Sequence, residues 1–134
     1  MEINGIIKKI NRGVPQGSSI SPYLFNIFQN SLYKGLRKHY RNTADQFFSF
    51  ADDLAFTFIN IGDLKWKLLK IKQWAEKYKL KINELKSGIL FKRKKAHIWA
   101  LNATKKELFN FPIVDNYKYL GVILDRNLNI TKHF

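Results

Sequence analysis

Residues 47–58 read FFSFADDLAFTF, in which two aromatic-rich apolar runs flank the adjacent carboxylates Asp52 and Asp53. Short, phenylalanine-rich runs with small polar interruptions at Ser49 and Thr57 are typical of β-strands. Asp is disfavoured in strands and favoured in turns, so the sequence predicts a hairpin with both carboxylates at its bend. Neighbouring negative charges repel each other, and oxygen ligands on a rigid turn suit Mg²⁺. A turn whose carboxylates are hydrated, or paired with Lys or Arg, is the alternative.

The composition of the 134-residue chain indicates one folded domain, since 46% of its residues are hydrophobic and 15% aromatic. Lys and Arg number 24 against 10 Asp and Glu, a net charge of +14, which favours a nucleic acid or an anionic membrane surface as partner. No apolar run approaches the roughly 20 residues that cross a bilayer. The absence of Cys excludes disulfides and cysteine-based metal sites, and we expect an intracellular protein, in the nucleus or the cytoplasm.

Two segments precede the acidic pair. Met1–Arg12 predicts a small hairpin about Asn4-Gly5, whose short first arm suggests that the chain begins inside a larger fold. Gly13–Pro22 is a loop that leads into a helix, with Ser21 as N-cap and Pro22 at the first helical position. Such a loop offers N–H groups and hydroxyls to a phosphate or a base edge, although a plain connection has the same composition. The helix should run to about His39 on an apolar stripe of Leu24, Phe25, Phe28, Leu32 and Leu36.

A second helix and several strands are predicted downstream. Asp63 is the expected N-cap of a helix whose buried face holds Leu64, Leu68, Ile71, Ala75 and Tyr78. Its other faces carry Lys65, Lys67, Lys70, Lys72, Lys77 and Lys79, which indicates a phosphate-facing surface, a solvated face or a membrane-surface helix. Strands are expected at 89–91, 97–100, 111–113 and 117–125. The strand at 111–113 should lie at a sheet edge, because Pro112 cannot donate a hydrogen bond to a neighbouring strand. In the strand at 117–125, Gly121 indicates a bulge or a close approach.

Four blocks of sequence follow one another along nearly the whole chain. They are GVPQGSSISPYLFN at 13–26, FADD at 50–53, a looser block at 74–91 that contains LKINELKS at 80–87, and YLGVILD at 119–125. In this order they resemble the reverse transcriptase of non-LTR retrotransposons, and 80–87 is similar to that family's leucine-asparagine-x-x-lysine-threonine segment. The first block is specific for the family, whereas an Asp-Asp pair alone is not.

The resemblance implies an α/β (α+β) fold over residues 1–134: a partial polymerase palm, with two helices packed on one face of a small antiparallel sheet. It also implies an RNA-directed DNA polymerase that extends a primer 3′-hydroxyl by two-metal nucleotidyl transfer. Its implied cofactor is Mg²⁺, with Mn²⁺ as the alternative. Its implied partners are an RNA template, a DNA primer, deoxynucleoside triphosphates and the polymerase segments absent from this sequence, with no membrane partner.

The resemblance also assigns roles to individual residues. Asp52 matches the metal-binding aspartate and Asp53 the less direct second carboxylate, while Phe50 stands where the family most often has Tyr. Lys86 matches a lysine that approaches the triphosphate as a candidate proton donor to pyrophosphate. Pro15, Gln16, Gly17 and the adjoining Ser18 match the family's loop that lies against the template and the incoming nucleotide. Tyr119, Leu120 and Gly121 match the hairpin that supports the primer end.

The sequence departs from the family pattern in one respect. The family's first metal-binding aspartate precedes the glycine-glutamine loop, whereas Met1–Arg12 contains no Asp. Fingers, upstream palm and thumb are also missing, so we expect this polypeptide alone to have little or no polymerase activity. An intron-maturase-type reverse transcriptase and a non-catalytic, basic nucleic-acid-binding remnant are the two other functions that the sequence leaves open.

Overall fold

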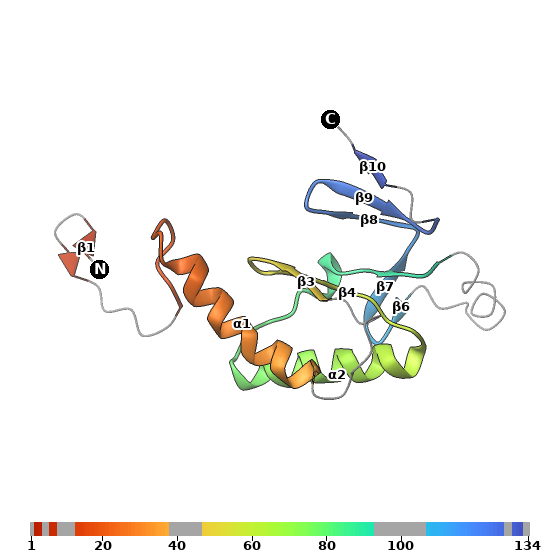
Figure 1. Cartoon of the computed structure of the whole chain (residues 1–134), viewed down its shortest axis with the longest axis horizontal. Helices are drawn as coiled ribbons and strands as arrows, with labels where there is room; N and C mark the ends of the chain where they lie inside the picture. Colours follow the sequence, from red (N-terminus) through yellow and green to blue (C-terminus); the bar gives the residue numbers. More distant parts are fainter. Residues whose placement is uncertain are drawn as a thin grey trace. The chain divides into compact units, whose positions relative to one another are not determined.

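The computed structural model describes residues 2–3, 6–7, 13–37, 47–92, 107–127 and 130–132, without the side chains of 2–3, 6–7, 37 and 130–132. The chain divides into two compact units, Met1–Tyr78 and Lys79–Phe134, and each is described by itself (Figure 1). Within the described ranges, no helix is both long and apolar enough to cross a bilayer. The strand predicted at 97–100 lies outside the described residues.

The first unit holds both α-helices. Its elements are β1 (Glu2–Ile3), β2 (Ile6–Ile7), α1 (Ser21–Arg37), β3 (Phe47–Phe50), β4 (Asp53–Phe56) and α2 (Ile61–Lys77). β1 and β2 pair antiparallel in the register Ile3 to Ile6, which confirms the hairpin predicted for the start of the chain. β3 and β4 form a second antiparallel hairpin, which confirms the strands predicted around the acidic pair.

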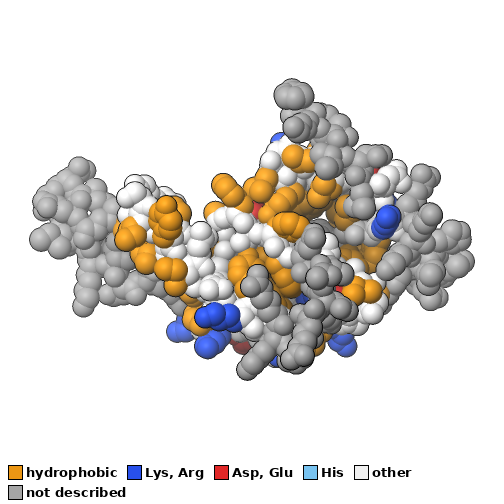
Figure 2. Space-filling view, in the orientation of Figure 1, with side chains coloured by type: hydrophobic (Ala, Val, Ile, Leu, Met, Phe, Trp, Pro, Cys, Tyr) orange, Lys and Arg blue, Asp and Glu red, His pale blue; other side chains and the backbone are white. Residues whose placement is uncertain are grey.

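The start of α1 lies one residue before the predicted one, because Ser21, expected as the N-cap, is the first helical residue, and the Leu24 N–H donates to the Ile20 carbonyl at 3.1 Å. Its predicted apolar stripe is only partly right: Leu32 and Leu36 are buried, whereas Leu24 is 44% exposed. Figure 2 shows further hydrophobic side chains at the surface of the first half of this helix, where Tyr23 and Ile27 are exposed. The C-terminal half of α1 therefore packs into the core, and the N-terminal half projects from it.

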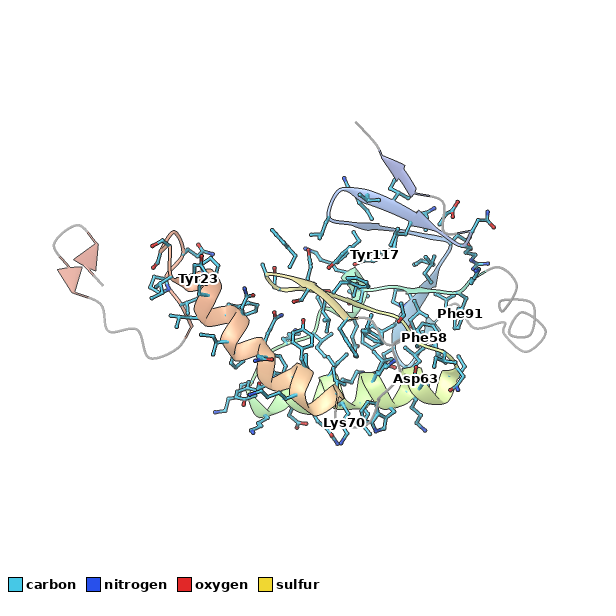
Figure 3. The ribbon with its side chains drawn as sticks, in the orientation of Figure 1. Tyr23, Phe58, Asp63, Lys70, Phe91 and Tyr117 are labelled. Carbon is cyan, nitrogen blue, oxygen red and sulfur yellow. The ribbon has the colours of Figure 1, made fainter. Side chains whose placement is uncertain are left out.

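The start of α2 differs from the prediction. Asn60, not Asp63, is the N-cap, and its side-chain oxygen accepts a hydrogen bond from the Asp63 backbone N–H at 2.9 Å. Asp63 is buried within the first turn and accepts from the Ile59 N–H at 3.0 Å. Figure 3 shows Phe58 and Asp63 where the chain passes from β4 into α2. The interpretation of Asp63 as the cap was wrong because the cap lies three residues earlier, as side-chain capping of the third helical N–H requires.

The buried face of α2 contains the predicted apolar residues and, in addition, a charged lysine. Leu64, Leu68, Ile71 and Ala75 are buried, and α2 packs against α1 through the rings of Phe28, Trp74 and Tyr78. Lys67 was predicted among the lysines outside this face, but it is fully buried. Its ammonium group binds the Asp63 carboxylate at 2.9 Å and the Thr57 carbonyl at 3.0 Å. A buried lysine persists because these groups compensate its charge.

The second unit consists of short strands and one 3₁₀ turn. Its elements are η1 (Glu84–Lys86), β5 (Ile89–Leu90), β6 (Glu107–Leu108), β7 (Phe111–Val114), β8 (Asn116–Tyr119), β9 (Val122–Asp125) and β10 (Ile130–Lys132). They form two sheets, ordered β5-β7-β6 and β10-β9-β8. The chain is therefore mixed α/β as predicted, but the described strands form four small sheets rather than one, and β5 runs parallel to β7.

Two strand predictions in this unit were wrong. β7 is the central strand of its sheet, although it contains Pro112. In the two-residue hairpin of β6 and β7 the closing pair is Leu108–Phe111, so Pro112 and Glu107 form the next pair, which exchanges no backbone hydrogen bonds. Pairing with β5 begins only at Ile113, so no ladder bond needs the missing N–H. Residues 117–125 are two strands rather than one, because Gly121, at φ +81°, lies in the turn between β8 and β9.

Candidate active site

The acidic pair lies at a tight turn. Phe50 pairs with Asp53 across β3 and β4, so the connection consists of Ala51 and Asp52 alone. Asp52 is therefore at the bend as predicted, whereas Asp53 is the first residue of β4. Ala51 has φ +49°, while Asp52 has a negative φ, and a positive φ at the first of two turn residues is the pattern of a type II′ hairpin. That position favours glycine, so Ala51 holds an unfavourable backbone conformation beside the first carboxylate.

Both carboxylates are open to solvent. Asp52 and Asp53 are exposed, and within the described part of the chain no hydrogen bond or ion pair involves either side chain. Asp53 lies directly across from Phe50, whose ring is 65% exposed, and the period of two places Phe48 on the same face. The opposite face carries Phe47 and Phe56, whose rings lie 5.7 Å apart. The hairpin thus turns one face towards the core and presents the other face, with Asp53, to solvent.

The loop at 13–20 is fastened to the start of α1. The Ser21 hydroxyl, in a buried residue, donates to the Pro15 carbonyl at 2.6 Å, and the Ser21 N–H donates to the Ser18 carbonyl at 3.2 Å. Gly17 has φ +83°, a conformation that side chains rarely adopt. Ser21 therefore does more than begin the helix, because it also closes the loop that contains the predicted nucleotide-binding residues.

A pocket of about 660 Å³ lies between this loop and the hairpin. Its lining comes from the loop, from the first turns of α1 and from the end of β3, and consists of Val14, Pro15, Gln16, Gly17, Ser18, Ser19, Ser21, Pro22, Phe25, Asn26, Ser49, Phe50 and Ala51. The structure thus brings Pro15–Ser18 and the residues just before Asp52 around one space. Asp52 and Asp53 do not belong to the lining themselves and follow directly after Ala51.

Gln29 connects α1 to the acidic turn. It is 5% exposed, and its side-chain Nε2 donates a hydrogen bond to the Ala51 carbonyl at 3.1 Å. Sequence reasoning did not select this residue, although a signal was present: Gln29 lies between Phe25 and Leu36 on the stripe that was expected to be apolar. A polar side chain at a core position of an amphipathic helix indicates a buried hydrogen bond.

The remaining predicted site residues belong to the second unit. Lys86 ends η1, is exposed, and its carbonyl accepts from the Tyr117 hydroxyl at 2.5 Å. Gly88 lies under this tyrosine, since an added Cβ would come within 2.9 Å of the Tyr117 ring. Leu120 and Gly121 form the β8–β9 turn with positive φ at both positions, as in a type I′ hairpin. η1 and this hairpin are thus joined through Tyr117.

The donors available for a metal ion are few. No group of three His, Asp or Glu side chains suited to a metal occurs among the described residues. Asp52 and Asp53 are hard oxygen donors at a turn, and Mg²⁺ is commonly bound by one or two carboxylates with water and substrate phosphates as its other ligands. The residues present therefore fit Mg²⁺ or Mn²⁺ held together with a nucleotide.

The family model described as reverse transcriptase (RNA-dependent DNA polymerase) matches residues 2–124, which is most of the chain. This chain belongs to the reverse transcriptase family. The prediction from the four sequence blocks is thereby confirmed at the level of the family. The match includes the glycine-glutamine loop, the acidic hairpin and the β8–β9 turn.

Curated relatives of this reverse transcriptase segment come from Drosophila mobile elements. The RNA-directed DNA polymerase from mobile element jockey of Drosophila melanogaster is 27% identical over 95% of this chain, and that of Drosophila funebris is 32% identical over 95%. The probable RNA-directed DNA polymerase from transposon X-element of Drosophila melanogaster is 28% identical over 90%. The chain spans about 14% of the length of each of these relatives. No solved structure gives a significant match.

Proposed function

We propose that this chain is part of the palm of an RNA-directed DNA polymerase from a non-LTR mobile element, with residues 1–134 all belonging to that region. The observation that carries the proposal is the pocket that the loop at 13–19 shares with Ser49, Phe50 and Ala51. A polymerase must hold the incoming nucleotide next to metal-binding carboxylates, and Asp52 follows this pocket directly. The relatives' names support a mobile-element polymerase rather than an intron-maturase-type enzyme.

In this proposal Asp52 and Asp53 hold Mg²⁺, or Mn²⁺, at the turn of the hairpin. When bound, such ions stabilise the negative charge that develops as a primer 3′-hydroxyl joins an α-phosphate. Exposure of both carboxylates leaves room for substrate phosphates and water to supply the other ligands. The chain's own task is to fix the two carboxylates at one short turn.

The loop residues Pro15, Gln16, Gly17 and Ser18 contact the template and the incoming nucleotide. Their backbone is held by the Ser21 hydrogen bonds to Pro15 and Ser18, so the loop keeps one conformation beside the shared pocket. Fixed polar groups bind a phosphate or a base without the entropic cost of ordering a free loop.

In the second unit we assign Lys86 to the triphosphate, as a proton donor to the leaving pyrophosphate, and Tyr119, Leu120 and Gly121 to the support of the primer. Lys86 is exposed at the end of η1. Asn83 caps this short turn, since its side-chain oxygen accepts a hydrogen bond of 3.1 Å from the Lys86 backbone N–H. The exposed lysines of α2, among them Lys65 and Lys77, contact the nucleic-acid backbone through charge alone. Lys67 has no part in this, since it is buried.

The test is binding of Mn²⁺ in the presence of a deoxynucleoside triphosphate, measured by electron paramagnetic resonance on this chain. We expect dTTP and Mn²⁺ to bind together, and Asp52→Asn to abolish binding without unfolding the chain. A matched control is Asp115→Asn, which removes one exposed carboxylate of the second unit that pairs with Arg126.

Two results would contradict the proposal. Equal losses for Asp52→Asn and Asp115→Asn would mean that Mn²⁺ responds to net charge only. The second is that the chain binds RNA, but no variant changes the binding of Mn²⁺ with dTTP. That result would favour the non-catalytic, basic nucleic-acid-binding function.

A further inference from the structure

The acidic turn has an unfavourable backbone conformation at an exposed residue. Ala51 occupies φ +49° without being glycine, and its neighbour Asp52 has no side-chain partner among the described residues. A two-residue turn of this kind would be expected to interconvert with alternatives, and the carboxylate directions would change with it. Something must hold the turn if the carboxylates are to bind a cation in one geometry.

Among the described residues, the side chain that a hydrogen bond ties to this turn comes from α1. Gln29 Nε2 donates to the Ala51 carbonyl at 3.1 Å, across 22 residues of sequence. The carbonyl belongs to the peptide group whose nitrogen is that of Asp52, so the bond fixes the plane from which the Asp52 side chain extends. The same helix begins at Ser21, beside the loop, and α1 therefore connects the loop and the turn through a rigid element.

The remaining amide atom of Gln29 argues against a role in stability alone. Its Oε1 is buried and has no hydrogen-bond partner within the described residues. A buried acceptor without a partner is unfavourable, and an apolar side chain of the same shape would avoid that penalty. Ala51 is exposed and its hydrogen bond with Gln29 is only partly buried, so loss of this bond costs less than it would in the core.

We propose that Gln29 is a positioning residue for the metal-binding turn: it holds the Ala51–Asp52 peptide, and thereby the Asp52 carboxylate, in the orientation that binds a divalent cation with a nucleotide. This inference rests on the proposed function for its catalytic meaning. Its structural content, that Gln29 fixes the turn, can be measured separately.

The first experiment uses Gln29→Met, since methionine is unbranched and similar in shape to glutamine. We expect the melting temperature to stay the same or to rise, because a buried unpartnered acceptor is removed. We expect the affinity for Mn²⁺ with dTTP to fall by about threefold to tenfold, the range of one ordinary hydrogen bond. A structural role would instead lower the melting temperature and the affinity together.

Ser31→Ala is the matched control. It removes the hydrogen bond of 2.8 Å that Trp74 Nε1 donates to Ser31 Oγ and the one of 2.8 Å that Oγ donates to the Phe28 carbonyl, so α1 again loses side-chain hydrogen bonds, but neither leads to the acidic turn. We expect it to leave the Mn²⁺ affinity unchanged. An equal loss of affinity in Ser31→Ala and Gln29→Met would overturn the proposal.

Rescue gives a second, independent measurement. Glycine at position 51 adopts positive φ without strain, so it needs less support from Gln29. We expect Gln29→Met combined with Ala51→Gly to recover most of the lost affinity. A double variant no better than Gln29→Met would contradict the proposal.

Failure of the proposed function can be told apart from failure of this inference. The amide resonance of Asp52, followed by nuclear magnetic resonance without any metal, should shift in Gln29→Met and stay in place in Ser31→Ala. If the unmodified chain binds no Mn²⁺ and this shift is seen, the proposed function fails and the role of Gln29 at the turn stands. If the Asp52 resonance does not move in Gln29→Met, the inference itself is wrong.

Discussion

Asp63 and Asp52 lie 11 residues apart in the same unit and have opposite environments. Asp63 is 6% exposed and accepts hydrogen bonds from the Lys67 ammonium and the Ile59 N–H. Asp52 is exposed at a turn beside a second carboxylate, without a side-chain partner among the described residues. The carboxylate that holds the fold together is paired with a buried ammonium group, and the one proposed to bind a metal has no such partner among the described residues. Charge compensation thus separates a structural acid from the acid that we propose as a metal ligand.

The largest effect on stability is expected at the buried acid. Asp63→Ala leaves the Lys67 ammonium in the core without its carboxylate, and breaking a buried pair from one side costs about 3–5 kcal/mol. We expect the free energy of unfolding of the first unit to fall by that amount in urea titrations. The fluorescence of Trp66 and Trp74, both in α2, reports the transition.

The double variant Asp63→Leu, Lys67→Met is the control for this prediction. Both charges are then absent, so it should lose much less stability than Asp63→Ala. If Asp63→Ala costs under about 1 kcal/mol, as an exposed ion pair does, the buried pair does not stabilise the fold as described.

The opposite result is expected at the turn. Asp52→Asn should change the free energy of unfolding by no more than about 0.5 kcal/mol, because an exposed side chain without a partner is replaced. Its affinity for Mn²⁺ with dTTP should fall more than about 100-fold, since loss of a supporting partner behind a metal ligand alone costs about 10–100-fold. Urea titration and the Mn²⁺ titration measure the two quantities on the same sample. A loss of stability as large as that of Asp63→Ala would erase the difference between the two acids.

The sequence predicted the local elements because each has its own pattern. FFSFADDLAFTF predicts a hairpin without reference to any other segment, and Ser21-Pro22 predicts a helix start in the same way. The helical spacing of the apolar residues from Leu64 to Ala75 likewise predicts the buried face of α2. The hairpin and the buried stripe are confirmed in the structure, and the helix start is right to within one residue.

What the sequence could not show are partners from distant segments. A lysine on a helix is usually solvated, and Lys67 is buried only because the Thr57 carbonyl and the Phe47 ring, which lies 5.7 Å from its ammonium, surround it. Gln29 likewise depends on the Ala51 carbonyl, 22 residues away. Pro112 was assigned to an edge because its register with two neighbours was unknown. Each of these errors concerns a tertiary contact and not a local preference.

The smallest expected change in stability tests whether the backbone of the acidic turn is strained at Ala51. Ala51→Gly relieves a left-handed conformation that costs an alanine about 1–2 kcal/mol, while glycine adds about 0.5–1 kcal/mol of chain entropy to the unfolded state. We expect the free energy of unfolding to rise by up to about 1 kcal/mol in urea. Asn110→Gly, at φ +71° in the turn between β6 and β7, is the control and should gain less, because Asn tolerates this conformation. If Ala51→Gly lowers stability, the turn is held without strain, and the hydrogen bond from Gln29 then has no unfavourable conformation to support.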